Sequence, residues 1–161
     1  MIRFIKCDVK VSEKFFLKEI DWQIEPGQVW VIVGPNGSGK SALGAAVSGE
    51  FQITEGYFEC DSSVAVVSLE EQARLIQRER ERNNSDLIDE IDDGTSVDEI
   101  LSENSKNPVL LAELIESFDM GPLLSRGFRK LSTGESRKVL LIRAITSCPE
   151  ILVLDEPYEG L

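Results

Sequence analysis

The sequence predicts an α/β fold built around a parallel core sheet. The run Val29–Val33 is continuous, apolar and rich in β-branched residues, which is typical of a strand buried on both faces. It leads through a glycine-rich loop into the helical segment Ser41–Val47, which we expect to end near Gly49. A second apolar run, Ile151–Leu154, follows the helical pattern of Thr133–Ser147. Buried strands that alternate with helices favour a parallel sheet.

An antiparallel β-subdomain is predicted at the N-terminus. The segments Ile2–Lys10 and Phe15–Ile24 alternate apolar and polar residues and are separated by a short polar step, which indicates a hairpin. Tyr57–Cys60 and Val64–Ser68 are predicted to be two further strands. We expect residues 1–69 to form this subdomain together with the core around the glycine loop.

The middle of the chain is polar and predicted to be mainly helical. Helices are expected over Glu70–Arg82, over Ser96–Leu101 after a capping-type Thr95-Ser96 step, and over Val109–Phe118 after Pro108. The acidic segment Asp86–Asp93 is expected to be a loop. Residues 70–130 would then be a helical arm, and residues 131–161 would complete a single domain of 1–161 with a helix and the second buried strand.

The composition limits the function classes. Among 161 residues, 29 acidic and 17 basic side chains give a formal charge of −12, which opposes direct binding of nucleic acid. The 3 cysteines are widely spaced and the chain has no histidine, so we expect reduced core thiols and no zinc site. No window approaches the ~18 apolar residues that span a bilayer. These features predict a cytoplasmic location without membrane insertion.

The glycine-rich loop is the strongest functional motif. Its glycines allow successive backbone N–H groups to approach phosphate oxygens, the lysine reaches the β- and γ-phosphates, and the serine hydroxyl binds Mg²⁺. A chance match in this length is on the order of half a per cent. The predicted ligand is therefore ATP with Mg²⁺, bound by Gly34, Pro35, Asn36, Gly37, Ser38, Gly39, Lys40 and Ser41.

Two carboxylates follow the second predicted buried strand. Asp155 and Glu156 come directly after Leu154. After a phosphate-binding loop at this separation, an aspartate at a strand end is suited to hold Mg²⁺, and the adjacent glutamate to polarise an attacking water. We predict Lys40 and Glu156 as catalytic residues and Ser41 and Asp155 as metal ligands.

The segment before this strand resembles a known family. Leu131-Ser132-Thr133-Gly134-Glu135 is similar to the LSGGQ signature of ATP-binding-cassette (ABC) ATPases, with threonine for one glycine and glutamate for glutamine. Glu159-Gly160-Leu161 looks like the start of the family's D-loop. The resemblance implies that two cassettes close head-to-tail around two nucleotides. The signature would then serve the partner's ATP through Ser132, Thr133, Gly134 and Glu135.

Resemblance to one branch of the family is closer still and covers most of the chain. It is carried by four stretches: Leu69–Gln72, Arg82–Asp86, Arg129–Lys138 and Leu154–Leu161. Members of that branch carry two cassettes in one polypeptide, have no membrane-spanning part and are associated with molybdate transport. The second cassette would be supplied by the same full-length chain or by a homodimer. Two alternatives stay open. One is an ATPase subunit of another ABC importer, peripheral at the inner membrane face on a permease, and the other is an ABC ATPase without a transport role.

The chain departs from the family pattern in several places. A glutamine that senses the γ-phosphate and Mg²⁺ is expected after the strand at Val66-Val67, and Gln72 is the candidate although it falls a few residues late. No clear aromatic residue for adenine stacking is found, since Phe15 is as readily a core strand residue. The sequence also stops before the family's switch histidine. We therefore expect hydrolysis in the full-length protein and weak or no hydrolysis by these 161 residues alone.

Overall fold

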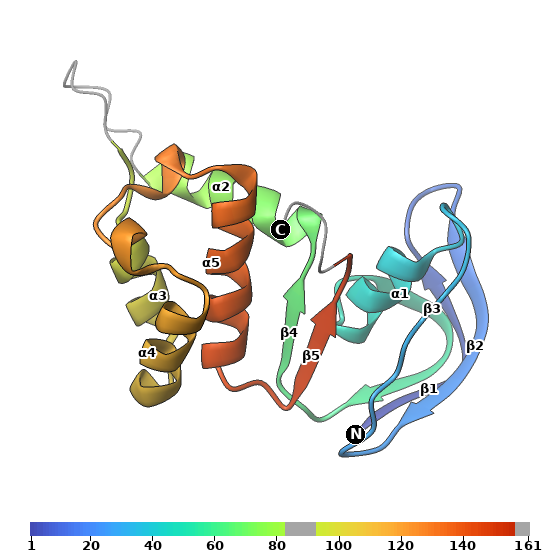
Figure 1. The fold of residues 1–161 in the computed structure, drawn as a ribbon. Coiled ribbons are helices and arrows are strands. Elements are labelled where there is room, and N and C mark those ends of the chain that lie inside the picture. Colours follow the sequence, from blue (N-terminus) through green and yellow to red (C-terminus); the bar gives the residue numbers. More distant parts are fainter. Residues whose placement is uncertain (83–92, 157–161) are drawn as a thin grey trace.

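A computed structural model describes residues 1–82 and 93–156 of the chain (Figure 1). Most of the loop predicted over Asp86–Asp93, and the D-loop resemblance at Glu159–Leu161, lie outside the described residues. The fold class is the predicted one: an antiparallel β-sheet, a parallel pair of strands and a set of helices, each contributed by a distinct stretch of the chain. None of the described helices is both long and apolar enough to cross a lipid bilayer.

The antiparallel sheet places β1 (Ile2–Lys10) between β2 (Phe16–Ile24) and β3 (Gln52–Cys60). The predicted hairpin is confirmed, and β3 begins five residues earlier than predicted because Gln52 and Ile53 also pair with β1. Buried apolar residues alternate along β1 at Ile2 and Phe4 and again at Cys7 and Val9, with the period of a strand interrupted between the two pairs.

A β-bulge interrupts the pairing of β1 with β3. Between the pairs Ile5↔Tyr57 and Asp8↔Glu55, two residues of β1 face the single residue Gly56 of β3. Gly56 has a φ of 80°, in the left-handed region that favours glycine. A Cβ at this position would lie 2.3 Å from the carbonyl oxygen of Lys6. The bulge therefore depends on a glycine.

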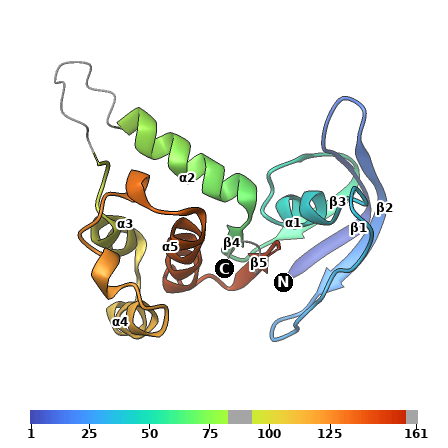
Figure 2. The same cartoon turned by 45° about the horizontal axis from the view of Figure 1, so that its top comes forward.

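The parallel sheet consists of β4 (Val64–Val67) and β5 (Ile151–Leu154), paired in register from Val64↔Ile151 to Val67↔Leu154. The second predicted strand is therefore present, but the prediction that it is buried is wrong for Leu152 and Leu154, which are 38% and 46% exposed, because among the described strands only β4 lies beside it. Helix α1 (Lys40–Val47) packs between this pair and the antiparallel sheet, where Ala46 and Val47 are buried. Helix α5 (Thr133–Thr146) covers the other side, so that the two strands lie between α1 and α5 in both views (Figures 1 and 2). The end of β5 is thus brought beside the start of α1, where Lys40 and Asp155 line one pocket, while the signature segment begins α5 on the other side of the two strands.

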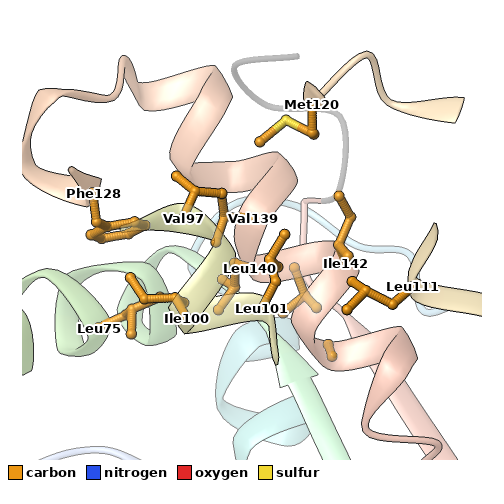
Figure 3. Close-up of a cluster of buried hydrophobic side chains, with 12 residues drawn as sticks. Leu75, Val97, Ile100, Leu101, Leu111, Met120, Phe128, Val139, Leu140 and Ile142 are labelled. Carbon is orange, nitrogen blue, oxygen red and sulfur yellow. The ribbon is translucent and has the colours of Figure 1, made fainter. Parts of the chain in front are cut away.

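The three helices predicted for the middle of the chain are present. They are α2 (Leu69–Arg82), α3 (Val97–Asn104) and α4 (Pro108–Ser117), followed by two 3₁₀ turns at Gly121–Leu123 and Phe128–Lys130. Ser96 caps α3 through a capping box with Glu99, and Asn107 caps α4 ahead of Pro108. These helices pack on α5 around a buried apolar cluster (Figure 3). Its members are Val67, Leu75, Val97, Ile100, Leu101, Leu111, Met120, Phe128, Val139, Leu140, Ile142 and Ala144.

The prediction of a buried strand over Val29–Val33 is wrong. The segment belongs to no sheet among the described residues, and Val29, Val31 and Val33 are 92%, 81% and 84% exposed. A buried strand needs neighbours that bond to its backbone and cover its side chains, and the described part of the chain supplies none: β5 pairs with β4 alone. The segment is apolar as its sequence shows, but whether it is buried depends on the segments that pack beside it.

The cysteines are all free, as predicted, but they are not all in the core. Cys7 is buried and Cys60 is half-buried, whereas Cys148 is exposed after the end of α5. The prediction of core thiols is therefore correct for Cys7 and wrong for Cys148, which follows the last turn of the helix rather than lying on its apolar face.

Candidate functional site

The glycine loop ends in a helix start that has no side-chain cap. Helix α1 begins at Lys40, and its N-cap residue is Gly39, with a φ of 94° and no capping side chain. The first N–H groups of an α-helix have no partner within the helix, and a capping side chain usually takes one of them. Here these donors are left for a ligand, and the positive end of the helix dipole favours an anion.

Lys40 folds back over the loop. Its Nζ donates hydrogen bonds of 3.0 Å to the carbonyl oxygens of Gly34 and Pro35. The ammonium group is therefore held close to the loop at the start of α1, beside the N–H groups that have no side-chain cap. Asn36, Gly37 and Ser38 complete the turn, and the Ser38 N–H donates to the Pro35 carbonyl at 3.2 Å. This arrangement brings a cation and oriented N–H donors together, which suits phosphate.

Ser41 and Asp155, far apart in sequence, line one pocket of about 260 Å³. The N–H of Asp155 donates to the Val67 carbonyl at 2.9 Å, which carries the β4–β5 ladder one residue further and fixes where the aspartate leaves the sheet. A hydroxyl and a carboxylate are hard oxygen donors, and Mg²⁺ in proteins is commonly held by one or two carboxylates together with substrate phosphates. The donor set therefore fits Mg²⁺.

Glu156 follows Asp155 at the surface in a strained backbone conformation. Its φ is 49°, in the left-handed region that a non-glycine residue adopts rarely. The carbonyl oxygens of Asp155 and Glu156 both accept hydrogen bonds from Arg137 of α5. The two predicted carboxylates thus lie next to each other on a turn that is held from the helix side. Sequence reasoning missed Arg137, which could have been noticed as a charged residue on the otherwise apolar face of the α5 pattern.

The signature segment forms the N-terminus of α5. Ser132 is the N-cap, with Thr133 and Gly134 in the first turn. The Ser132 Oγ accepts from the Glu135 N–H at 3.2 Å, and the Glu135 carboxylate accepts from the Ser132 N–H at 2.6 Å, which is a complete capping box. The residues that resemble the signature are therefore together at a helix start, but part of their hydrogen-bonding capacity is used within the helix.

The capping box gives the Glu135 carboxylate a lowered pKa. The main cause is the hydrogen bond from the Ser132 backbone, followed by the Ser132 side chain, with Arg126 and Lys138 adding favourable charge. The pKa of Glu135 is lower in the folded state than its ordinary value of 4.5, so ionised Glu135 stabilises the fold at pH values above 4.5. This contribution is lost as the pH falls through the folded-state pKa.

We expect the free energy of unfolding to fall as the pH is lowered from about 5 to below the folded-state pKa of Glu135. Urea unfolding at several pH values measures this dependence. Other carboxylates also titrate in this window, so the informative quantity is the difference between the natural chain and Glu135→Gln. The variant should lose less stability over the window. An identical pH dependence of the two proteins would contradict the assigned role of Glu135.

Gln72 does not join Ser41 and Asp155 in their pocket. It is buried on α2, and its Nε2 donates to the Thr133 carbonyl at 3.2 Å and to the Ser136 Oγ at 2.7 Å. Its Oε1 is buried without a hydrogen-bond partner. In this structure Gln72 ties the start of α2 to the first turn of α5. Its predicted role as a metal ligand stays a prediction.

Phe15 lies beside the glycine loop. The sequence alone did not decide between adenine stacking and the core of a strand for this residue. It precedes β2 and is 38% exposed. A Cβ added to Gly39 would lie 3.2 Å from the Phe15 ring, and Phe15 and Lys40 line the same pocket of about 530 Å³. The structure thus places an aromatic ring next to the loop and outside the core.

Comparison with known proteins identifies the family. A family model described as "ABC transporter" matches residues 17–159. The chain belongs to the ABC transporter family. It is 40% identical to the ABC transporter ATP-binding protein ModF of Escherichia coli over 99% of its own length and 33% of ModF. It is 28% identical to the hemin import ATP-binding protein HmuV of Hahella chejuensis, over its whole length and 66% of HmuV.

Solved structures of this family share the fold. The chain superposes over its full length on RNase-L Inhibitor with a TM-score of 0.74 and 26% identity, covering 28% of that chain. The same TM-score is found for an ATP binding subunit of an ABC transporter, at 15% identity and 68% coverage of that chain. The resemblance seen in the signature and the phosphate loop is therefore confirmed for the family and for the fold. The chain spans about a third of the length of its ModF relative.

Proposed function

We propose that the chain binds ATP with Mg²⁺ at the Gly34–Ser41 loop. The observation that carries this proposal is the meeting of Ser41 and Asp155 in one pocket, next to a loop whose lysine is held over its own carbonyls. Bound Mg²⁺ would neutralise phosphate charge. The N–H groups at the start of α1 and the Lys40 ammonium would bind the triphosphate, and Ser41 and Asp155 would hold the metal.

Hydrolysis is proposed for the longer protein in which two cassettes meet. Glu156 would polarise the water that attacks the γ-phosphate, and Lys40 would stabilise the charge that develops on the phosphate oxygens. Ser132, Thr133, Gly134 and Glu135 would complete the ATP site of the partner cassette. Family membership and the position of these four residues at one helix start support this assignment.

An adenine contact is proposed for Phe15. The ring lies beside Gly39 and is partly exposed, so one face can accept a base next to the bound phosphates. Without such a ring, the backbone and lysine contacts would select for phosphate and not for the base.

We further propose an association with molybdate transport, which rests on the resemblance to the ModF branch alone. We also propose a cytoplasmic location, and binding to a permease if the protein instead serves another ABC importer. Comparing molybdate uptake by cells with and without the gene tests the transport association, and unchanged uptake would favour an ABC ATPase with another role.

The binding proposal predicts that ATP affinity depends on both Mg²⁺ and the γ- and β-phosphates. Calorimetric titration should show tighter binding of ATP with Mg²⁺ than with EDTA, and no comparable binding of AMP. Asp155→Asn should reduce the gain that Mg²⁺ provides by at least about tenfold, because a charged ligand is lost.

The exposed Asp61, in the turn after β3, provides the matched control. Asp61→Asn removes the same charge from the chain and should leave the Mg²⁺ gain unchanged. Equal binding of ATP and AMP, or equal effects of the two asparagine variants, would overturn the proposal.

A further inference from the structure

Arg137 carries a buried charge to which the proposed function assigns no role. Only 2% of the residue is exposed, and its side chain heads the fully buried ones by size among the described residues. Charged groups are rarely buried unless they are paired or hydrogen-bonded, because they lose their hydration. The partners of this guanidinium therefore indicate why it is kept in the interior.

The hydrogen bonds of Arg137 end on the turn after β5. One nitrogen, Nη2, donates to the carbonyl oxygen of Asp155 at 2.7 Å and to that of Glu156 at 3.0 Å. On the other side of the turn, the Asp155 N–H donates to the Val67 carbonyl at 2.9 Å. The main chain that carries the two carboxylates is thus bonded to β4 on one side and to α5 on the other.

The second of these carbonyls belongs to a strained residue. Glu156 has a φ of 49°, a conformation that persists in a non-glycine residue only when surrounding contacts maintain it. The bond from Arg137 is such a contact. Without Arg137, the Asp155 carbonyl would also lose its hydrogen bond from α5, and the main chain that carries the Asp155 carboxylate would be held on the β4 side alone.

The buried guanidinium of Arg137 is satisfied only in part. Its Nε and Nη1 have no hydrogen-bond partner in the described structure, so part of the buried cation is left unsatisfied. Replacing such a group by an apolar side chain of similar volume is often neutral or stabilising. The hydrogen bonds that Arg137 does make are both directed at the turn after β5.

The helix that carries Arg137 is itself fixed near the signature. Gln72 donates to the Thr133 carbonyl and to the Ser136 hydroxyl, which ties the first turn of α5 to the start of α2. Arg137 follows Ser136 directly on this helix. The backbone of α5 next to Arg137 is therefore held in place, and the guanidinium reaches the turn after β5 from this fixed part of the helix.

We propose that Arg137 is a positioning residue for the Mg²⁺ site. It holds the Asp155–Glu156 turn against α5, so that Asp155 lines the pocket with Ser41, and it acts through main-chain carbonyls rather than by contact with nucleotide or metal. This inference rests on the proposed function, since it assigns a cause for the geometry of that same site.

The test compares Arg137→Met with the natural chain in three measurements: affinity for ATP with Mg²⁺, affinity for ATP in EDTA, and thermal unfolding. We expect Mg-ATP affinity to fall about tenfold, as for other residues that orient a metal ligand. Affinity in EDTA should change by less than about twofold, and thermal unfolding shows whether the variant is folded. Arg137→Lys, which keeps the charge and a donor, should recover part of the Mg-ATP affinity.

A double-mutant cycle decides whether Arg137 acts through Asp155. In an Asp155→Asn background, Arg137→Met should have little further effect on Mg-ATP affinity. An undiminished loss in that background, an equal loss with EDTA, or an unchanged Mg-ATP affinity would overturn the inference. If Arg137→Met does not fold, Arg137→Lys is judged by the same comparison with and without Mg²⁺. Absence of Mg-dependent binding in the natural chain would instead overturn the proposed function.

Discussion

Replacing Lys40 with alanine should weaken Mg-ATP binding by on the order of 100-fold, since hydrogen bonds to charged groups contribute about 1.5–3 kcal/mol each and this ammonium can form more than one with phosphate. The Nζ already lies at the loop, bonded at 3.0 Å to the Gly34 and Pro35 carbonyls. Binding of a fluorescent ATP analogue measures the loss. Thermal unfolding should change little, because within the described part of the chain the half-buried Lys40 donates side-chain hydrogen bonds to the two loop carbonyls alone.

Lys18 provides the matched control for this substitution. It carries the same charge and lines the same pocket of about 530 Å³, but it lies on β2 and not in the glycine loop. Lys18→Ala should lower the affinity by no more than about threefold, the effect of an exposed charge at a distance. Comparable losses in the two variants would mean that the general field of the pocket, rather than the loop, binds the phosphates.

Replacing Gly56 with alanine should destabilise the fold by about 4 kcal/mol or prevent folding, because a left-handed backbone and overpacking each cost about 1–3 kcal/mol. The added Cβ would lie 2.3 Å from the Lys6 carbonyl oxygen, 2.5 Å from that of Ile5 and 2.6 Å from the Lys6 carbonyl carbon. All three are backbone atoms of the central strand, so they cannot move aside as a side chain can. Urea unfolding measures the change.

Gly27 separates the two causes of this effect. It has a φ of 79°, close to that of Gly56, but an added Cβ would meet nothing within 4 Å. Gly27→Ala should therefore cost only the backbone strain, about 1 kcal/mol. If both variants lost the same stability, the contact between β3 and the bulge of β1 would not be the reason that position 56 needs glycine.

Elements with a strong local pattern were predictable from the sequence. The alternation of Ile2–Lys10, the cap at Ser96 and the apolar run Ile151–Leu154 each specify an element through residues close in the chain, and each is found at or near its predicted position. Val29–Val33 has an equally clear pattern, yet it is exposed. The apolar pattern indicates that burial of these side chains would be favourable. Whether they are buried depends on neighbouring strands that other segments must supply.

In the candidate site too, the local features were predictable from the sequence and the contacts between distant residues were not. The loop from Gly34 to Ser41 is contiguous, so its spacing alone predicts a place where phosphate can approach the backbone. The contacts of Gln72 were not predictable in this way: its amide donates to Thr133 and Ser136, which lie more than 60 positions later in the chain. The final direction of a side chain depends on which partners packing brings within reach.

By itself, the sequence determined the phosphate loop, the helix starts and the family, because these are carried by short stretches whose backbone preferences and spacing act locally. Only the tertiary structure decided that Ser41 and Asp155 share a pocket, that Arg137 reaches the turn after β5, and that Gly56 faces a bulge. Those contacts join residues tens of positions apart, and they exist only once the strands and helices have packed against one another.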